Sequence, residues 1–428
     1  MKKVDSLVDR DKKSVWHPFT SLESPLPVIP IRSAKGVYLY TEEGEKILDA
    51  ISSWWVNIHG HAHPKIAQAI SDQAQKLEQV IFAGFTHEPA IKLAENLLNI
   101  LPSDQQKVFY SDDGSTSVEV ALKLAIQYWQ NQEITSKKRI IAFDGAYHGD
   151  TFGAMSIGER GSFNLPFASY LFEVDFVDFP QKNNHDKLVG SFKDLAGTGE
   201  VAAFIFEPLV QGAAGMRMYD PDILDQLVGI ARDSDIISIA DEVMTGFGRT
   251  GRLFASQYLE NQPDIFCLSK GITGGTLPLG VTTCSQKIVE AFLSADSSKT
   301  FFHGHSYTAN PLACAAANAS YEILLHEDTK KNIKRISARH LEFANSLQGH
   351  KKLKDVRCLG TILALEIGTS GQTSYFNKVR DKIYQYAMNR GILIRPLGNV
   401  VYVMPPYVIT DEQLDTIYDC LQGILEVV

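Results

Sequence analysis

Three apolar segments in the middle of the chain each end on a polar residue. FIFE ends at Glu207, ISIAD ends at Asp241 and FCLSK ends at Lys270. The intervals of 34 and 29 residues between these positions each match one strand–helix–strand unit of roughly 30 residues. Because the carboxyl ends of parallel strands meet at one edge of a sheet, where ligands bind in such folds, we expect an acid and a lysine to face one crevice.

The surrounding pattern predicts an α/β fold with a mainly parallel sheet, since short apolar runs alternate with amphipathic segments. One crossover helix is predicted by a cap at Asp220, a first-turn proline at Pro221 and an apolar face. That face comprises Leu224, Leu227, Val228 and Ala231. The predicted strands are 108–110, 139–143, 201–206, 236–240 and 264–268.

The two ends of the chain have a different pattern. A hairpin is predicted over 37–51, with its turn at Glu43-Gly44. Near the C-terminus, strands are expected at 362–367, 392–395 and 400–404, followed by a helix that begins with the capping box Thr410-x-x-Gln413. We therefore expect a large cofactor-binding domain of residues 60–310 and a smaller α+β domain formed by residues 1–59 with 311–428.

Charge and composition narrow the class of partner. The chain has 41 Lys and Arg against 50 Asp and Glu, a net charge of -9, and no basic block. This balance argues against nucleic acid or an anionic membrane and favours small-molecule substrates. No apolar run reaches the ~18 residues of a membrane span. The five cysteines form no C-x-x-C pair, and no apolar leader follows the charged N-terminus, so we expect a cytoplasmic protein.

A lysine and an acid in one crevice are the groups that pyridoxal phosphate uses. The lysine forms a Schiff base with its aldehyde, and the carboxylate keeps the pyridine nitrogen protonated. Gly114-Ser115-Thr116, between a strand and a helix, could hold the phosphate, and Tyr147-His148 could flank the ring. The alternatives are solvated charges at the strand ends, helix capping by Ser115 or Thr116, and ordinary aromatic packing.

Two other motifs point to different chemistry. GFGRTG, residues 246–251, matches the dinucleotide fingerprint G-x-G-x-x-G, so an NAD-dependent oxidoreductase is an alternative. Five residues separate the motif from the preceding strand, however, and no acid ends the next strand, which makes this reading weak. The histidines of 59–63 and 303–305 have the spacing of metal ligands. They lack an accompanying carboxylate or cysteine cluster, so we expect packing or polar contacts and no metal.

The segment DEVMTGFGRTG followed by SKGITGG resembles the class III aminotransferases, which are pyridoxal-phosphate enzymes of fold type I, and the likeness extends over nearly the whole chain. The resemblance implies a catalytic group of Lys270, Asp241 and Tyr147, in which Lys270 forms the Schiff base and Glu207 supports Asp241. It implies that Gly114 and Ser115 hold the phosphate. It also implies a homodimer with shared active sites, in which His305 and Ser306 reach the partner's cofactor.

Further motifs narrow the likeness to a branch of this family that serves biotin biosynthesis. They are WHPFTS, SSWWVNIHGHAHP, AYHGDTFGAMSIG, VQGAAGMRMYDP, FFHGHSYTANPLACAAANAS and IRPLGNVVYVMPPY. The branch converts 8-amino-7-oxononanoate to 7,8-diaminononanoate. The substrate contacts that the resemblance implies are Phe19, Trp54, Trp55, Tyr147, Arg249, Lys270, Gly304 and Arg395. A long keto acid needs an aromatic wall and a guanidinium for its carboxylate, which Trp54, Trp55 and Arg395 could supply.

The amino donor is open at this point. Phe19 stands where a tyrosine is usual, and His305-Ser306 where Pro-Thr is common; these variants also occur in relatives that use lysine. The Trp54-Trp55 pair favours S-adenosylmethionine, which is the donor we expect. The alternatives are the same acceptor with lysine as donor, another class III ω-aminotransferase, or a non-catalytic regulator fused to a DNA-binding module, for which residues 1–20 are too short.

Overall fold

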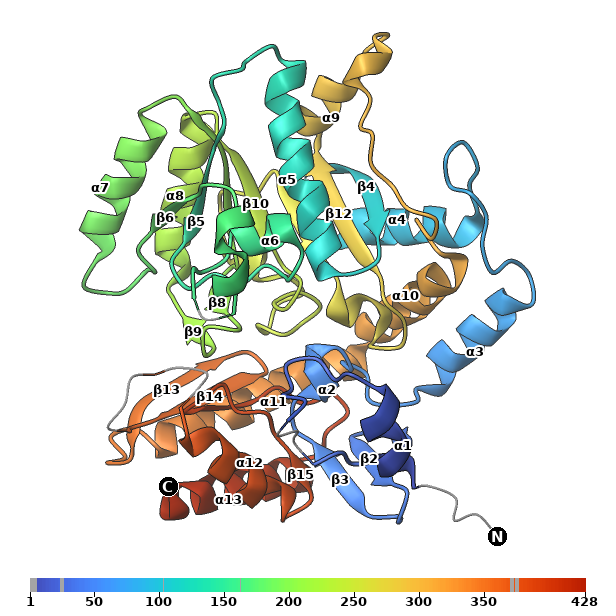
Figure 1. The fold of residues 1–428 in the computed structure, drawn as a ribbon, viewed down its shortest axis with the longest axis vertical. Helices are drawn as coiled ribbons and strands as arrows, with labels where there is room; N and C mark the ends of the chain where they lie inside the picture. Colours follow the sequence, from blue (N-terminus) through green and yellow to red (C-terminus); the bar gives the residue numbers. More distant parts are fainter. Residues whose placement is uncertain (1–5, 24–26, 103, 162, 370–372, 374–376) are drawn as a thin grey trace.

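The computed structural model describes residues 6–23, 27–102, 104–161, 163–369, 373 and 377–428. Its central element is a seven-stranded sheet with the order β4-β12-β11-β10-β7-β5-β6 (Figure 1). Only β12 runs antiparallel to its neighbours within this sheet. The predicted α/β class with a mainly parallel sheet is therefore confirmed. The strands are β4 (Gln105–Ser111), β5 (Arg139–Phe143), β6 (Asp175–Val177), β7 (Val201–Phe206), β10 (Ile237–Asp241), β11 (Ile265–Leu268) and β12 (Gly280–Ser285).

Both faces of this sheet are buried, because alternate residues of each strand point to opposite sides. Ile140 and Ala142 of β5 belong to the apolar core beneath α5 (Gly114–Asn131). Ile141 and Phe143 belong to the larger core on the other side, which includes residues of α7 (His185–Ala196) and α8 (Pro221–Asp233). The sequence prediction for α8 is confirmed, since Asp220 caps it, Pro221 begins it and its apolar face is buried.

A second part of the structure joins the two ends of the chain. Its four-stranded sheet has the order β1-β2-β3-β15, with β1 (Ile31–Lys35), β2 (Tyr38–Thr41), β3 (Lys46–Asp49) and β15 (Ile392–Leu393). A three-stranded sheet of β13 (Leu353–Leu359), β14 (Ile362–Ile367) and β16 (Val400–Val403) lies with it in the lower half of Figure 1. The pairing of N-terminal and C-terminal strands agrees with the expected small domain, whose borders at 59/60 and 310/311 stay a prediction.

Helices complete both parts. The structure has α1 (Leu7–Ser14), α2 (Ser52–Trp55), α3 (Pro64–Ala74), α4 (Glu88–Ile100), α6 (Phe152–Ser156), α9 (Gln286–Phe292), α10 (Pro311–Leu324), α11 (Glu327–Ser346), α12 (Val379–Met388) and α13 (Asp411–Val427). The capping box predicted at Thr410 is present at the start of α13. Within the described residues, no helix has both the length and the apolarity needed to cross a membrane.

Several predicted strand bounds need correction: 108–110 extends to 105–111, 236–240 lies at 237–241, 264–268 begins at 265 and 400–404 ends at 403. β15 ends at Leu393 instead of residue 395. The nearby Pro396 has no N–H to donate to a neighbouring strand, which favours an early end of the strand. The strands β1, β6, β12 and β13 are not among the predicted ones. The two that belong to the central sheet, β6 and β12, lack the usual signal. β6 is only Asp175–Val177, and β12 has the sequence GVTTCS, so neither has the apolar run that signals a buried strand.

Candidate active site

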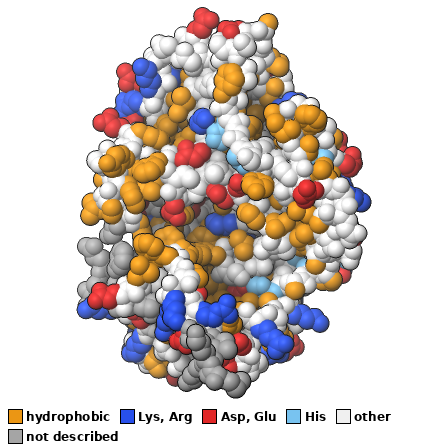
Figure 2. Space-filling model, turned by 45° about the vertical axis from the view of Figure 1, so that its right-hand side comes forward, with side chains coloured by type: hydrophobic (Ala, Val, Ile, Leu, Met, Phe, Trp, Pro, Cys, Tyr) orange, Lys and Arg blue, Asp and Glu red, His pale blue; other side chains and the backbone are white. Residues whose placement is uncertain are grey.

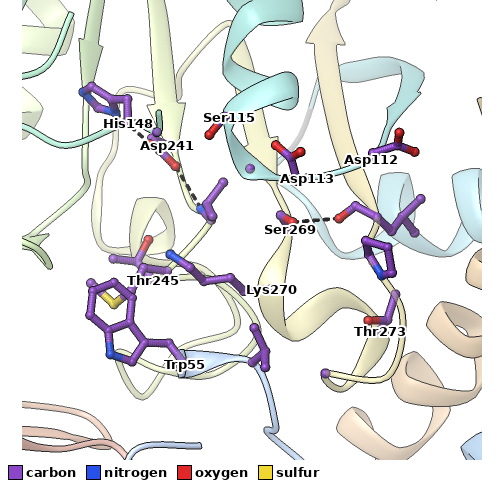
Figure 3. A pocket seen from close by; sticks show the side chains of 18 of the residues that line it. Trp55, Asp112, Asp113, Ser115, His148, Asp241, Thr245, Ser269, Lys270 and Thr273 are labelled. Carbon is purple, nitrogen blue, oxygen red and sulfur yellow. Dashed lines mark hydrogen bonds and ion pairs between the residues drawn. The ribbon is translucent and has the colours of Figure 1, made fainter. Parts of the chain in front are cut away.

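A cavity of about 480 Å³ lies at the carboxyl edge of the seven-stranded sheet. Its lining comes from the ends of β7, β10 and β11, from the start of α5 and from the turn after β11 (Figure 3). The molecular surface is hollowed near the middle of the face drawn in Figure 2, where acidic and basic side chains are exposed among hydrophobic ones. The predicted crevice is therefore present, and Glu207, Asp241 and Lys270 all line it.

Lys270 begins the short 3-10 helix η3 (Lys270–Thr273) directly after β11. Its backbone has φ of +47°, a left-handed conformation that residues other than glycine adopt mainly at special sites. Its Nζ lies 4.6 Å from the centre of the Trp55 ring. Burial lowers the pKa of Lys270 to about 8, although Asp241 and Glu207 act in the opposite direction. The structure thus holds an amine that loses its proton readily and points between Trp55 and Asp241 (Figure 3).

Asp241 ends β10, the strand between those that lead to Glu207 and Lys270. Its Oδ2 lies 2.7 Å from Nδ1 of His148, and its Oδ1 accepts the N–H of Val243 at 3.1 Å. Both Asp241 and His148 are buried. The other ring nitrogen of His148, Nε2, is buried and has no hydrogen-bond partner among the described residues. His148 and the N–H of Val243 therefore fix the orientation of the Asp241 carboxylate.

Glu207 follows β7 and faces the same cavity. Its Oε1 accepts the N–H of Tyr147 at 3.0 Å, and its Oε2 accepts the N–H of Gly212 at 2.9 Å. Burial raises the pKa of Glu207 to about 7, an effect that Asp241 strengthens and His148 opposes. Glu207 thus fixes the backbone at Tyr147, and its supporting role toward Asp241 stays a prediction.

The start of α5 faces the cavity from the opposite side. Asp113 caps this helix by accepting the N–H of Thr116 at 2.9 Å, and the Thr116 hydroxyl completes the capping box by accepting the N–H of Asp113 at 3.0 Å. The alternative of capping is therefore confirmed in part for Thr116 and wrong for Ser115. Ser115 Oγ instead accepts the N–H of Asp150 at 3.1 Å. A Cβ at Gly114 would lie 2.7 Å from a methyl group of Val243. Position 114 therefore requires glycine, and the Ser115 side chain does not cap the helix.

Aromatic residues form a wall beside the lysine. Trp55 is buried, and its Nε1 donates to the hydroxyl of Tyr402 at 2.9 Å. Trp54 is half-exposed and meets Phe19 edge to face, with ring centres 5.6 Å apart. The guanidinium of Arg395 lies over the Trp54 ring at 4.7 Å. Trp55 and Tyr147 line the cavity, whereas Phe19, Trp54 and Arg395 are not among its lining residues.

Other expected contacts lie outside the cavity lining. Arg249 is 1% exposed and donates to the carbonyls of Pro405 and Trp55 at 2.9 and 3.3 Å. Gly304, His305 and Ser306 lie in the loop that precedes α10 and do not line the cavity of their own chain. His305 Nδ1 is 3.4 Å from Asp112, which does line it. The roles assigned to these four residues stay predictions.

Sequence reasoning gave no role to Glu242, although it follows Asp241 directly. Its fully buried carboxylate accepts the Thr245 hydroxyl at 2.5 Å, the N–H of Ala255 at 3.1 Å and both the N–H and the hydroxyl of Ser256. It thereby links Thr245, which directly precedes the GFGRTG turn, to η2 (Ala255–Tyr258). That turn opens no α-helix, which removes the structural basis of the dinucleotide reading. The sequence signal for this role was the presence of a second acidic residue directly after the strand-end aspartate.

Comparisons with known proteins agree with this geometry. The family model of class-III aminotransferases matches residues 20–425. An adenosylmethionine-8-amino-7-oxononanoate aminotransferase from Synechococcus elongatus is 48% identical over 420 residues, with 96% of this chain and 98% of the relative covered.

Two solved structures extend the comparison. The crystal structure of the enzyme of the same name from Methanocaldococcus jannaschii has a TM-score of 0.93 at 34% identity, with 99% of each chain covered. A PLP-bound amine transaminase from an uncultivated Pseudomonas species has a TM-score of 0.90 at 29% identity, with 96% of this chain and 98% of the other covered. The chain belongs to the class III aminotransferases, and it is an aminotransferase of the α/β fold with a largely parallel central sheet.

Proposed function

We propose that the protein is a pyridoxal-phosphate-dependent aminotransferase that converts 8-amino-7-oxononanoate to 7,8-diaminononanoate in biotin biosynthesis, with S-adenosylmethionine as amino donor. One observation carries the proposal: the Lys270 amine, the Asp241 carboxylate and the first residues of α5 line a single cavity. The names of the Synechococcus and Methanocaldococcus relatives support the choice of acceptor and donor.

The residues present fit the cofactor. Lys270 Nζ has no hydrogen-bond partner among the described residues and would form the covalent bond to the aldehyde. Two donors hold the Asp241 carboxylate in place for the pyridine nitrogen. The first N–H groups of α5, at Gly114 and Ser115, have no partner within the helix and face the cavity, where they and the helix dipole would bind a phosphate.

Residues of the chain itself transfer the proton of the substrate carbon. The cofactor supplies an electron sink for the negative charge that develops on the substrate carbon. Because burial lowers the pKa of Lys270 to about 8, its amine is partly unprotonated near neutral pH and can take a proton and return it. The buried face of Trp55 beside Nζ limits the access of water to the amine. Tyr147, whose N–H is fixed by Glu207, lies on the same cavity.

The wall beside the cavity suits the proposed substrates. Arg395 forms no ion pair with a described carboxylate and rests on Trp54, so it can bind the carboxylate of a long keto acid. Phe19 and Trp54 offer apolar surface to its chain. An indole face also attracts a sulfonium cation, which supports S-adenosylmethionine as donor. Phe19 lacks the hydroxyl that a tyrosine would offer, and lysine is the second candidate donor for that reason.

The proposed assembly is a homodimer in which His305 and Ser306 complete the partner's cofactor site. Neither residue lines the cavity of its own chain, as such an arrangement requires. Mixing Lys270→Ala subunits with subunits inactivated by Ser306→Glu should restore part of the activity through hybrid dimers with one intact site. No recovery under conditions of proven subunit exchange would reject the shared site.

The cytoplasm is the proposed compartment, since all five cysteines are free thiols.

The experiment is a product assay with the purified, cofactor-loaded protein. It is given 8-amino-7-oxononanoate with S-adenosylmethionine or lysine, and 7,8-diaminononanoate is measured by mass spectrometry. We expect product with S-adenosylmethionine. Product with lysine alone would replace the donor and leave the acceptor standing. Turnover of 4-aminobutyrate or ornithine without any 7,8-diaminononanoate would reject the acceptor in favour of another ω-aminotransferase.

A further inference from the structure

The turn that carries Trp54 and Trp55 has a strained backbone. Ser52, Ser53 and Trp55 have φ angles of +53°, +59° and +70°. Residues with a Cβ avoid this left-handed region, and several of them within one turn persist only where the surroundings hold them. The short helix α2 is accordingly irregular, with Ser53 and Trp54 outside helical geometry. Some group must therefore hold the turn.

Asp49, the last residue of β3, is in the position to do so. It is fully buried, and its Oδ1 accepts the N–H of Ile51 at 3.0 Å. Its Oδ2 accepts the N–H of Ser53 at 2.7 Å and Nε2 of His61 at 2.8 Å. One carboxylate thus bonds two backbone groups of the strained turn and one imidazole.

His61 is itself held from behind. Its backbone forms a two-hydrogen-bond bridge with Gly36, at 2.7 Å and 3.1 Å, which ties it to the N-terminal hairpin. Its side chain is 9% exposed. The backbone of His61 is therefore fixed in place, and its imidazole has one acidic partner, Asp49. This contact directs the Asp49 carboxylate toward the turn. This contact explains one member of the histidine motif at 59–63.

The turn held in this way presents the two tryptophans. Trp55 lies beside the Lys270 amine, with Nζ 4.6 Å from its ring centre (Figure 3). Trp54 meets Phe19 and supports the guanidinium of Arg395. Neither Asp49 nor His61 lines the cavity. The hydrogen bonds of Asp49 connect the pair to this wall through the turn.

We propose that Asp49 and His61 form a positioning pair that sets the Trp54-Trp55 wall and thereby substrate binding, without contacting the substrate. The inference rests on the proposed function for the identity of the substrate. The pair makes no hydrogen bond to α5, where Gly114 and Ser115 face the cavity. Loss of the pair should therefore weaken substrate binding and leave cofactor loading intact.

The chain contains four tryptophans, which makes the wall directly observable. In a Trp16→Phe, Trp129→Phe background, Trp54 and Trp55 supply all of the indole fluorescence. Asp49→Asn and His61→Leu are compared with His61→Gln, which keeps a donor for Asp49. The control is Asp328→Asn, at a His326–Asp328 pair whose side chains are 67% and 74% exposed. Each variant is loaded with cofactor before acrylamide quenching and kinetics are measured.

We expect Asp49→Asn and His61→Leu to increase the quenching constant about twofold and the KM for the keto acid about tenfold, which corresponds to one weakened binding contact. The kcat should fall less than threefold, and the cofactor content should stay at the background level. His61→Gln should recover most of both values, and Asp328→Asn should change neither.

Unchanged quenching in Asp49→Asn and His61→Leu would overturn the proposal, as would His61→Gln behaving like His61→Leu. If Asp49→Asn fails to fold, the comparison of the two His61 variants decides. If the native protein with all four tryptophans does not turn over the keto acid, the proposed function fails, while the quenching arm still tests the pair.

Discussion

Replacing Asp241 by asparagine tests the role of the Asp241 carboxylate in the site. In the native site, Nδ1 of His148 lies 2.7 Å from Oδ2 and the N–H of Val243 lies 3.1 Å from Oδ1. An asparagine keeps one acceptor, so its amide nitrogen must face either the N–H of Val243 or the Nδ1 of His148, both of which donate to the native carboxylate. His148 can accept from it only by moving its proton to Nε2, which is buried and has no partner among the described residues.

The size of the effect follows from these contacts. A hydrogen bond to a charged group contributes about 1.5–3 kcal/mol, so its loss weakens cofactor binding about ten- to a hundredfold. Turnover should fall further, by several orders of magnitude, because a neutral amide no longer favours the protonated pyridine. Cofactor should still bind, since the start of α5 and Lys270 are unchanged.

The assay compares Asp241→Asn with Glu207→Gln, a matched change at the neighbouring strand. The cofactor dissociation constant is measured by absorbance titration and turnover by single-turnover kinetics, from pH 6 to pH 9. Because the pKa of Glu207 is raised to about 7 by burial, this acid is mostly neutral at pH 6, where glutamine loses only the hydrogen bond from one of the two N–H groups that Glu207 accepts. The loss in Glu207→Gln should therefore be smallest at pH 6 and grow as pH rises and the native carboxylate ionises. Near-normal turnover of Asp241→Asn, or equal losses in both variants at pH 6, would refute the reasoning.

Further variants and conditions give separate tests. Gly149 has φ of +134°, and a Cβ there would lie 2.1 Å from Ser115 Oγ, so Gly149→Ala should displace Ser115 and weaken cofactor binding at least tenfold, measured by titration; unaltered affinity would remove Ser115 from the phosphate site. Because only the neutral amine attacks an aldehyde and the pKa of Lys270 is lowered to about 8, the rate of cofactor capture by cofactor-free protein should rise with pH up to about 8 and then level off. A rate that continues to rise to pH 10 would contradict that. Phe19→Tyr should raise the affinity for S-adenosylmethionine up to about tenfold, the value of one hydrogen bond, and no gain in an equilibrium titration would contradict the reasoning on Phe19.

The sheet could be predicted from the sequence because its central strands are continuous apolar runs. VAAFIF became β7 and RIIAF became β5 with unchanged bounds. The hairpin and the capping box at Thr410 were also local signals. β12 escaped prediction because a Gly-Thr-rich segment has no such run, and its burial depends on α5 and on neighbouring strands that lie far away in the sequence.

The site could be predicted only where chemistry stands at the end of a strand. Glu207, Asp241 and Lys270 met in one cavity because strand ends share an edge. The partners of these residues could not be foreseen, since His148 reaches Asp241 across 93 positions and Arg249 reaches the Pro405 carbonyl across 156. Asp113 is the N-cap because the helix begins at Gly114. The exact first residue of a helix is difficult to predict from sequence.

Lys270 is the residue on which the cofactor assignment depends. Borohydride reduction of the cofactor-loaded protein, followed by peptide mass mapping, tests this role directly. We expect a reduced pyridoxyl group on the peptide that contains Lys270, and no label in Lys270→Ala. A pyridoxyl group on any other lysine, or an unlabelled native protein that still forms 7,8-diaminononanoate, would contradict it.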